Sequence, residues 1–285
     1  MCFIIVSVFI ATLVLHVSSR NPALRIIGGS DVAEDELPYV GRIRLHLVLK
    51  NQGIVIFKEH MHVCTCSMFT PNWALTAGHC ITPDQITSSI EKDGVMMKYE
   101  YYIAYGPLEK NHTSQILQWY RHPGYLVKNF PFRLVNDIGL IKTKKIVLSQ
   151  YGHISALDST SMLGLEATAA GYGLMKIAGV IAPADIFEKP LQKLDVVVIK
   201  CSNFFQFIHP RLCVSRRCGK LEEICQGDSG GPLLHTSGII GVVSAGPSDA
   251  CNPLVDIQHL EVAAITPTSP FIDWISDVIN RETSA

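Results

Sequence analysis

The stretch Gly227–Leu233, which reads Gly-Asp-Ser-Gly-Gly-Pro-Leu, carries the clearest chemical signal in the chain. Ser229 directly follows the acid Asp228 and lies among glycines. A serine hydroxyl attacks a carbonyl only when a base takes its proton, and the oxyanion that forms needs preorganised N–H donors. Glycines let a backbone approach a substrate closely. The stretch therefore predicts acyl-transfer chemistry, provided that a base and an orienting acid exist elsewhere.

Two upstream motifs supply these partners. His79 lies in Thr76–Cys80, and Asp137 lies in Asn136–Ile141. Taken alone, His79 would more often be a packed or surface histidine, and Asp137 a turn residue or helix cap. Their order along the chain and their specific surroundings favour a triad, in which Ser229 attacks, His79 moves the proton and Asp137 holds the imidazole.

A second kind of hydrolase is compatible with the same serine motif. Gly227–Gly231 also satisfies the G-x-S-x-G pattern of α/β-hydrolases, which need the order serine, acid, histidine and a helix after the serine. Asp249 or Asp256, followed by His259, could formally complete that order. However, residues 239–243 are typical of a strand and too little chain remains for the rest of such a fold. This alternative is disfavoured.

The body of the chain predicts short strands separated by turn residues. The expected strands are Tyr39–Leu49, Gly53–Phe57, Tyr99–Tyr105, Asp137–Leu148, Leu194–Ile199 and Gly238–Ser244. Because no helices alternate with them, the pattern favours an all-β barrel or sandwich. One helix is expected at the C-terminus, where Ser269 is a candidate cap, Pro270 suits the first position and the apolar residues recur on one face. That face comprises Phe271, Trp274, Ile275, Val278 and Ile279.

The N-terminus and the cysteines point to an extracellular protein. Residues 3–17 form an apolar run that is shorter than the roughly 20 residues of a spanning helix, so residues 1–19 are expected to be a signal peptide. A signal anchor stays open because no basic segment precedes the run. Of nine cysteines, eight remain beyond Cys2, an even number that suggests disulfides in a secreted chain. Asn111 begins a glycosylation sequon.

Composition excludes some classes of partner and site. The 285 residues carry a formal net charge of −1 without a long run of one sign, so a nucleic-acid surface is not expected. A metal site is disfavoured, because Cys64 and Cys66 are too close for the usual ligand pair. Beyond residues 3–17, no segment is long and apolar enough to cross a bilayer.

The motifs together resemble those of the chymotrypsin/trypsin family of serine endopeptidases. The resemblance covers about residues 26–278 and rests on Ile26–Gly29, Trp73–Cys80, His122-Pro123, Asn136–Ile141, Gly227–Leu233 and Phe271–Ile275. It implies two six-stranded antiparallel β-barrels with the active site in the cleft between them and a C-terminal helix. The peptidase domain would span 26–285, with the boundary between its two barrels at about 145–165.

The resemblance also implies roles for further residues. The backbone N–H groups of Gly227 and Ser229 would form the oxyanion hole, and Ser244 would support Asp137 and line the cleft. Residues 20–25 would be a propeptide, removed after Arg25 by a trypsin-like protease. The freed α-amino group of Ile26 would then pair with Asp228. A buried pair of this kind costs desolvation unless it is well satisfied, so it can act as a switch.

Substrate preference is less clearly marked. By resemblance, Glu223 is the floor of the specificity pocket, where an acid favours Arg or Lys by charge pairing, and Gly246 keeps one wall open. Glu223 could equally have a structural role, which would leave a non-basic preference. The chain also departs from the family: Ala245 replaces a usual Trp, Tyr172 replaces another, and Asn252–Glu261 lacks the usual pattern. These departures suggest altered specificity rather than lost catalysis.

The resemblance pairs Cys64 with Cys80, Cys201 with Cys213, and Cys225 with Cys251. Cys66 and Cys218 are left over, and they could pair, stay free or bond another chain. No cofactor and no metal are implied. The expected partners are protein or peptide substrates, an activating trypsin-like protease and protein protease inhibitors, with no nucleic acid, no membrane and a monomeric state.

The sequence thus predicts a secreted serine endopeptidase with a preference for basic residues. The alternative is a catalytically silent homologue that acts as a binding or cofactor protein. The intact residues His79, Asp137 and Ser229 argue against that alternative, whereas the missing Trp and the unusual pocket wall leave it room.

Overall fold

The computed structural model describes residues 29–82, 86–107, 112–129, 132–173, 176–177, 180–181, 190–203, 207–216, 224–225, 227–246 and 261–284. Several sequence predictions lie outside these residues. They are the signal peptide (1–19), the propeptide (20–25), Ile26, Asn111, Cys218, Glu223, Cys251 and the segment Asn252–Leu260.

The first barrel is closed by six antiparallel strands. They are β2 (Val40–Asn51), β3 (Ile54–Thr70), β4 (Trp73–Thr76), β10 (Gly139–Thr143), β7 (His112–Arg121) and β6 (Val95–Tyr105), and the pairing of β2 with β6 closes the ring. A seventh strand, β5 (Thr87–Lys92), adds to the open side of β6. Two small sheets lie outside the barrels: one of β8 (Leu126–Asn129), β9 (Phe132–Val135) and β15 (Ile208–His209), and one of β12 (Lys176–Ile177) and β13 (Val180–Ile181).

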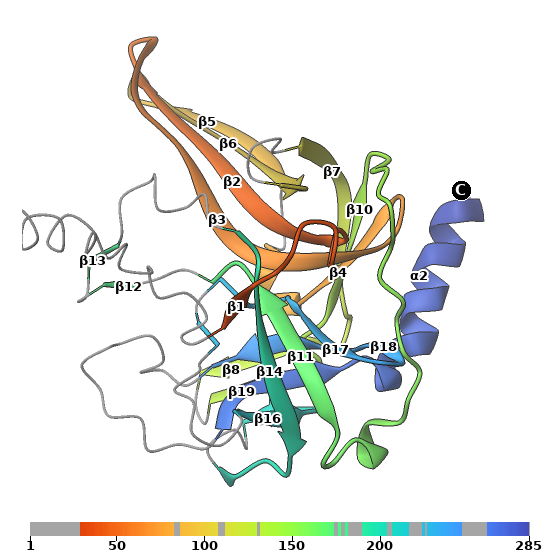
Figure 1. Ribbon diagram of the computed structural model, residues 1–285. Coiled ribbons are helices and arrows are strands. Elements are labelled where there is room, and N and C mark those ends of the chain that lie inside the picture. Colours follow the sequence, from red (N-terminus) through yellow and green to blue (C-terminus); the bar gives the residue numbers. More distant parts are fainter. Residues whose placement is uncertain are drawn as a thin grey trace, which may run out of the picture.

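The second barrel is built in the same way. Its six strands are β14 (Gln192–Ile199), β11 (Glu166–Gly171), β17 (Pro232–His235), β18 (Gly238–Ala245), β19 (Glu261–Pro267) and β16 (Leu212–Arg216), closed by β14 and β16. The short strand β1 (Ser30–Asp31) adds to β14. Figure 1 shows the two barrels one above the other, with the linking segment 144–165 along one side. The fold confirms the predicted pair of six-stranded antiparallel barrels.

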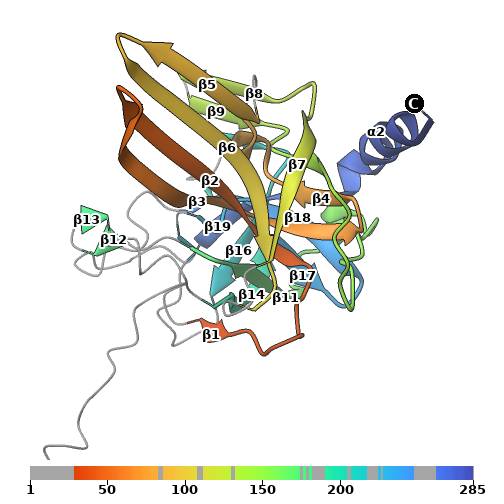
Figure 2. The same ribbon diagram turned by 90° about the horizontal axis from the view of Figure 1, so that it is seen from above.

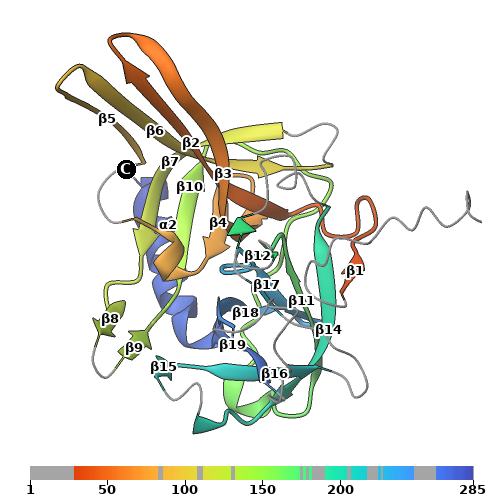
Figure 3. The same cartoon turned by 90° about the vertical axis from the view of Figure 1, so that its left-hand side faces the viewer.

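Part of the first barrel extends well beyond its closed ring. Strands β2 and β3 form a long hairpin, and β5 and β6 form a second one that pairs with it through β2 and β6. In all three views the two hairpins project together from the body of the molecule (Figures 1, 2 and 3). We call the sheet β3-β2-β6-β5 the projecting sheet. Sequence patterning gave only Gly53–Phe57 for its edge strand, whereas β3 continues to Thr70.

The C-terminal helix packs on the first barrel. Helix α2 (Ile272–Ser284) follows a 3₁₀ turn at Ser269–Phe271, and Phe271, Ile275 and Val278 are buried in the core cluster of the first barrel. The ring of His122 lies edge-on to Phe271 and Trp274, each at 5.0 Å. The predicted apolar face is therefore correct. The predicted cap is not, because Ser269 lies inside the 3₁₀ turn and its hydroxyl accepts a bond from Ser159 N.

Candidate active site

The pairing of two strands brings His79 and Asp137 together. His79 follows β4 in a 3₁₀ turn, and Asp137 precedes β10, whose Gly139 is paired with Thr76 of β4. The predicted strand Asp137–Leu148 is thus shorter than expected, because Asn136 turns the chain at φ +51° and residues beyond Thr143 leave the sheet. Asp137 therefore lies just before the sheet begins, where its side chain can form hydrogen bonds with His79.

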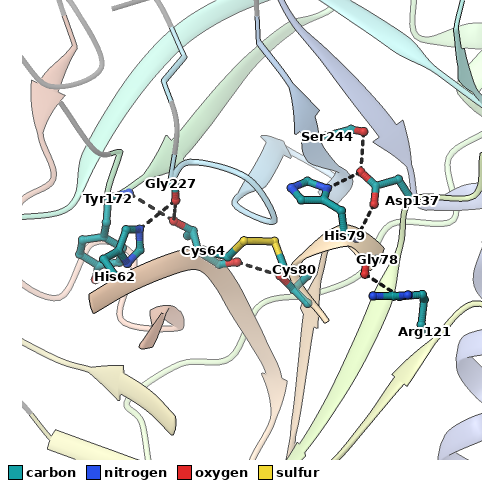
Figure 4. The surroundings of a disulfide bond; sticks show 12 residues. His62, Cys64, Gly78, His79, Cys80, Arg121, Asp137, Tyr172, Gly227 and Ser244 are labelled. Atoms are coloured by element: carbon teal, nitrogen blue, oxygen red, sulfur yellow. Dashed lines mark hydrogen bonds and ion pairs between the residues drawn. A yellow bond between two sulfur atoms is a disulfide. The ribbon is translucent and has the colours of Figure 1, made fainter. Parts of the chain in front are cut away.

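The Asp137 carboxylate fixes the imidazole with several bonds. Its Oδ2 accepts from His79 Nδ1 at 2.8 Å and from Ser244 Oγ at 2.6 Å, while its Oδ1 accepts from His79 N at 2.7 Å (Figure 4). Asp137 is 1% exposed. A carboxylate at Nδ1 selects the tautomer that carries its proton there, so the lone pair of Nε2 is left to act as a base.

The loop that carries Ser229 is seated between the barrels. Gly227 and Gly230 have φ values of +94° and +79°, which glycine adopts readily. A Cβ on Gly230 would lie 2.1 Å from Thr76 Oγ1, so only glycine fits there. The Ser229 carbonyl accepts from Thr65 N at 2.9 Å, and Gly230 N donates to Val243 O at 2.8 Å. One bond reaches each barrel, which fixes the loop in the cleft.

Two N–H groups of this loop remain available. Those of Asp228, Gly230 and Gly231 donate to backbone carbonyls. Within the described part of the chain, the N–H groups of Gly227 and Ser229 have no acceptor, and the Ser229 hydroxyl has no hydrogen bond to His79. Such bonds are often long or absent before a substrate binds. The two free donors are those expected for an oxyanion hole.

Asp228 is buried, and its carboxylate bonds to backbone N–H groups. Its Oδ1 accepts from Gly173 N at 2.7 Å, its Oδ2 accepts from Cys225 N at 2.8 Å, and it is 1% exposed. Burial raises the pKa of its carboxyl to about 7, although the two backbone donors oppose this rise. Among the described residues it forms no ion pair. The carboxyl therefore lacks a cationic partner in the described part of the chain.

Sequence reasoning missed two residues that bond to the loop of Gly227 and Ser229. His62 Nε2 and Thr65 Oγ1 both donate to the Gly227 carbonyl at 2.9 Å, as Figure 4 shows for His62. Burial lowers the pKa of His62 to about 4, with smaller contributions in the same direction from Arg42 and Arg44. The ring is thus neutral at physiological pH. The contacts join residues more than 160 positions apart, so local sequence patterns give no sign of them.

The cysteines follow the pairing that the resemblance implies, so far as they are described. The structure contains the disulfides Cys64–Cys80 and Cys201–Cys213. Cys225 is disulfide-bonded as well, and its expected partner Cys251 lies outside the described residues. Cys66 is a free, buried thiol, and burial raises its pKa to about 12. In the described ranges, one candidate metal cluster occurs, namely Cys64, His79 and Cys80, but its sulfurs are already oxidised to a disulfide.

The structure also describes Tyr172, Gly246 and Ser244, three further residues that the sequence analysis singles out. Tyr172, which replaces a usual Trp, carries the Arg42 guanidinium 4.2 Å above its ring and donates its hydroxyl proton to Val40 O. Gly246 tolerates no side chain, since a Cβ would lie 2.7 Å from Ile224 O. Ser244 is buried beside Asp137. Glu223, the expected pocket floor, lies outside the described residues.

Comparisons with known proteins agree with this architecture. The Trypsin family model matches residues 26–275. Putative trypsin-6 of Homo sapiens is 28% identical over 265 residues, with 90% of each chain covered. Granzyme M of Rattus norvegicus is 25% identical over 268 residues, again with 90% of each covered. CLIP domain-containing serine protease B4 of Anopheles gambiae is 29% identical over 280 residues, covering 90% of this chain and 70% of the relative.

In the described ranges, no helix combines the length and the apolar character that crossing a bilayer requires. With the two barrels, the bonds that join His79, Asp137 and Ser244 and a family match over most of its length, the chain belongs to the trypsin family of serine proteases.

Proposed function

We propose that the protein is a secreted endopeptidase that hydrolyses peptide bonds through an acyl-enzyme on Ser229. The observation that carries the proposal is the set of bonds at Asp137, which orients His79 with Nε2 free. The same set would stabilise the imidazolium that forms during catalysis. A silent homologue has no need of a buried carboxylate with three donors.

The proposed reaction divides the work among three residues. Ser229 Oγ attacks the scissile carbonyl while His79 Nε2 accepts its proton, and the N–H groups of Gly227 and Ser229 receive the oxyanion. His79 then donates the proton to the leaving amine, and water hydrolyses the acyl-enzyme by the same route. Removing one oxyanion donor typically costs about 3–4 kcal/mol of transition-state stabilisation.

We propose further that the protein is a zymogen activated by cleavage between Arg25 and Ile26. The raised pKa of Asp228 supports this, because a buried carboxyl without a cation would gain most from a new α-amino group. A trypsin-like protease would perform the cleavage. The mature enzyme would then prefer Arg or Lys before the scissile bond, provided that Glu223 forms the pocket floor.

Active-site labelling tests the proposal directly. The purified chain is treated with trypsin and then with a fluorophosphonate probe, which bonds covalently to an activated serine. We expect labelling only after cleavage at Arg25–Ile26, and none in Ser229→Ala. Arg25→Gln serves as a matched control, because it retains the triad but resists the activating cut. A wild type that is cleaved at this bond and stays unlabelled would instead support the silent homologue.

A further inference from the structure

Strand β3 leads directly from the candidate active site to the tip of the projecting sheet. Near the cleft, Thr65 N bonds to the Ser229 carbonyl and His62 bonds to the Gly227 carbonyl. From there the strand runs outward to Ile54 with β2 on one side. In the described part of the chain, no second strand pairs with β3 between Ile54 and Cys66. Its outer edge is therefore an open row of backbone donors and acceptors that begins at the nucleophile.

The far part of this edge is apolar and exposed. Ile54, Val55, Ile56 and Phe57 are 71%, 51%, 59% and 40% exposed. Natural edge strands usually carry charges or proline, which prevent pairing with other chains. This segment has neither, although Lys58 and Glu59 follow it. Contiguous exposed apolar residues on an open edge indicate a binding surface.

The ladder between β3 and β2 has two irregularities, one at each end of the exposed edge. The register shifts between Ile43 and Arg44 and between Leu49 and Lys50, so that Val63 and Ile56 of β3 have no opposite residue. Extra residues of this kind form β-bulges, which bend the strand and occur often beside active sites. The outer edge of β3 therefore bends at Val63, beside the candidate active site, and again at Ile56 near the tip.

The location of β3 indicates which part of a substrate would reach it. In the proposed reaction the acyl portion stays on Ser229, and the leaving amine takes its proton from His79. Cys64 of β3 is bonded to Cys80, the residue after His79. The edge of β3 therefore starts on the histidine side of the cleft, where the leaving-group residues lie.

We propose that the outer edge of β3 from Ile54 to Val63 binds the leaving-group side of protein substrates as an added β-strand. This inference rests on the proposed peptidase function. At roughly 3.3 Å per residue, the edge spans about 30 Å, enough for eight or nine substrate residues. Main-chain bonds would give affinity, and alternate side chains would contact Ile54 and Ile56. The preferred segment is extended, neutral and rich in β-branched or apolar residues.

Three substrates test the inference. They share one acyl-side sequence, chosen from a peptide library, and differ after the scissile bond: a small amide, an eight-residue segment of alternating Thr and Val, and the same segment with Pro at alternate positions. Proline removes the donors that strand addition needs. We expect kcat/KM for the Thr-Val substrate to exceed that for the Pro substrate about tenfold, which corresponds to roughly 1.4 kcal/mol.

Variants of the edge assign the effect to β3. In the double variant Ile54→Lys with Ile56→Lys, we expect the ratio of the two extended substrates to fall towards one while hydrolysis of the small amide is unchanged. Ile90→Lys is the matched control, since Ile90 is also apolar and 52% exposed but lies on β5, the opposite edge of the projecting sheet. It should preserve the ratio.

Several outcomes would overturn the inference. One is an equal kcat/KM for both extended substrates in the wild type, and another is an unchanged ratio in the lysine variant. Sedimentation tests the rival occupant: a wild-type dimer that the lysine substitutions dissociate, with no effect on the ratio, would assign the edge to a second copy of this chain. Failure of the proposed function is distinct, because the small amide and the fluorophosphonate probe would then fail as well.

Discussion

At the scale of single residues, His62 shows how a side chain outside the proposed triad holds the backbone beside Ser229. Its ring is buried and donates from Nε2 to the Gly227 carbonyl, and Nδ1 has no hydrogen-bond partner among the described residues. Only the neutral form with its proton on Nε2 suits that site. Protonation would place a charge beside Arg42 and Arg44, both of which lower the pKa of His62. The loop that contains Gly227 is thus held by an imidazole that must remain neutral.

This arrangement predicts a stability that is sensitive to acid. The folded pKa of His62 is about 4, below its ordinary value of 6.5. Between these pH values the unfolded chain binds the proton and the folded chain does not, so stability falls as pH decreases from about 6.5 to about 4. We expect His62→Gln to reduce this slope in urea unfolding at a series of pH values. His112→Gln, at an exposed position, should leave the slope unchanged, and equal slopes in all three proteins would refute the role of His62.

At the scale of elements, β3 is a strand of the first barrel that bonds to the loop of Gly227 and Ser229. The Thr65 hydroxyl donates to the Gly227 carbonyl and accepts from Tyr172 N at 3.3 Å, and its residue is fully buried. The backbone of Thr65 also bonds to Ser229. One residue of β3 therefore bonds to three residues, Gly227, Ser229 and Tyr172, from two segments around the candidate active site.

Replacing this hydroxyl tests the importance of the junction. Thr65→Val keeps the shape but leaves the Tyr172 N–H without its acceptor, and an unsatisfied buried group costs about 1–3 kcal/mol. We expect a loss of that size in unfolding free energy, together with slower fluorophosphonate labelling of the cleaved protein. Thr168→Val, which removes a more exposed bond to Asp195, is the control. If both variants label and unfold like the wild type, β3 does not hold the loop.

The elements also show where sequence reasoning reached its limit. Motifs around His79, Asp137 and Ser229 predicted both barrels, because those motifs recur in one fold. The length of β3 was underestimated, since Lys58–His62 carries charged and histidine residues that do not read as a buried strand. Pairing with β2 determines how far β3 extends, and a single sequence does not show that pairing. The sequence predicts Ser269 as a helix cap, but its hydroxyl instead accepts a bond from the N–H of Ser159, which is 110 residues away in sequence.

At the scale of the whole molecule, the proposed activation would couple the new N-terminus at Ile26 to the buried Asp228. Asp228 lies between Gly173 and Cys225, directly before the nucleophile. A Cβ on Gly171 would approach its Oδ1 to 2.2 Å, so the flanking glycine is needed to admit the carboxyl. The site is tight and apolar enough that ionisation without a cation destabilises the folded chain. Cleavage at Arg25 would supply that cation.

The raised pKa of Asp228 therefore predicts that stability against unfolding depends on pH differently before and after cleavage. Its folded value is about 7, above the ordinary 3.8, so between these values the folded chain holds a proton that the unfolded chain has released. Stability of the uncleaved form should then fall as pH rises from about 4 to 7, by roughly 4 kcal/mol. Asp228→Asn should abolish this component in urea unfolding, whereas Asp277→Asn, at an exposed position on α2, should retain it.

Cleavage should restore stability in the wild type most strongly above pH 7, where Asp228 is ionised, and should add little to Asp228→Asn. A wild type whose cleaved and uncleaved forms lose stability equally over this range would show that the new α-amino group does not reach Asp228.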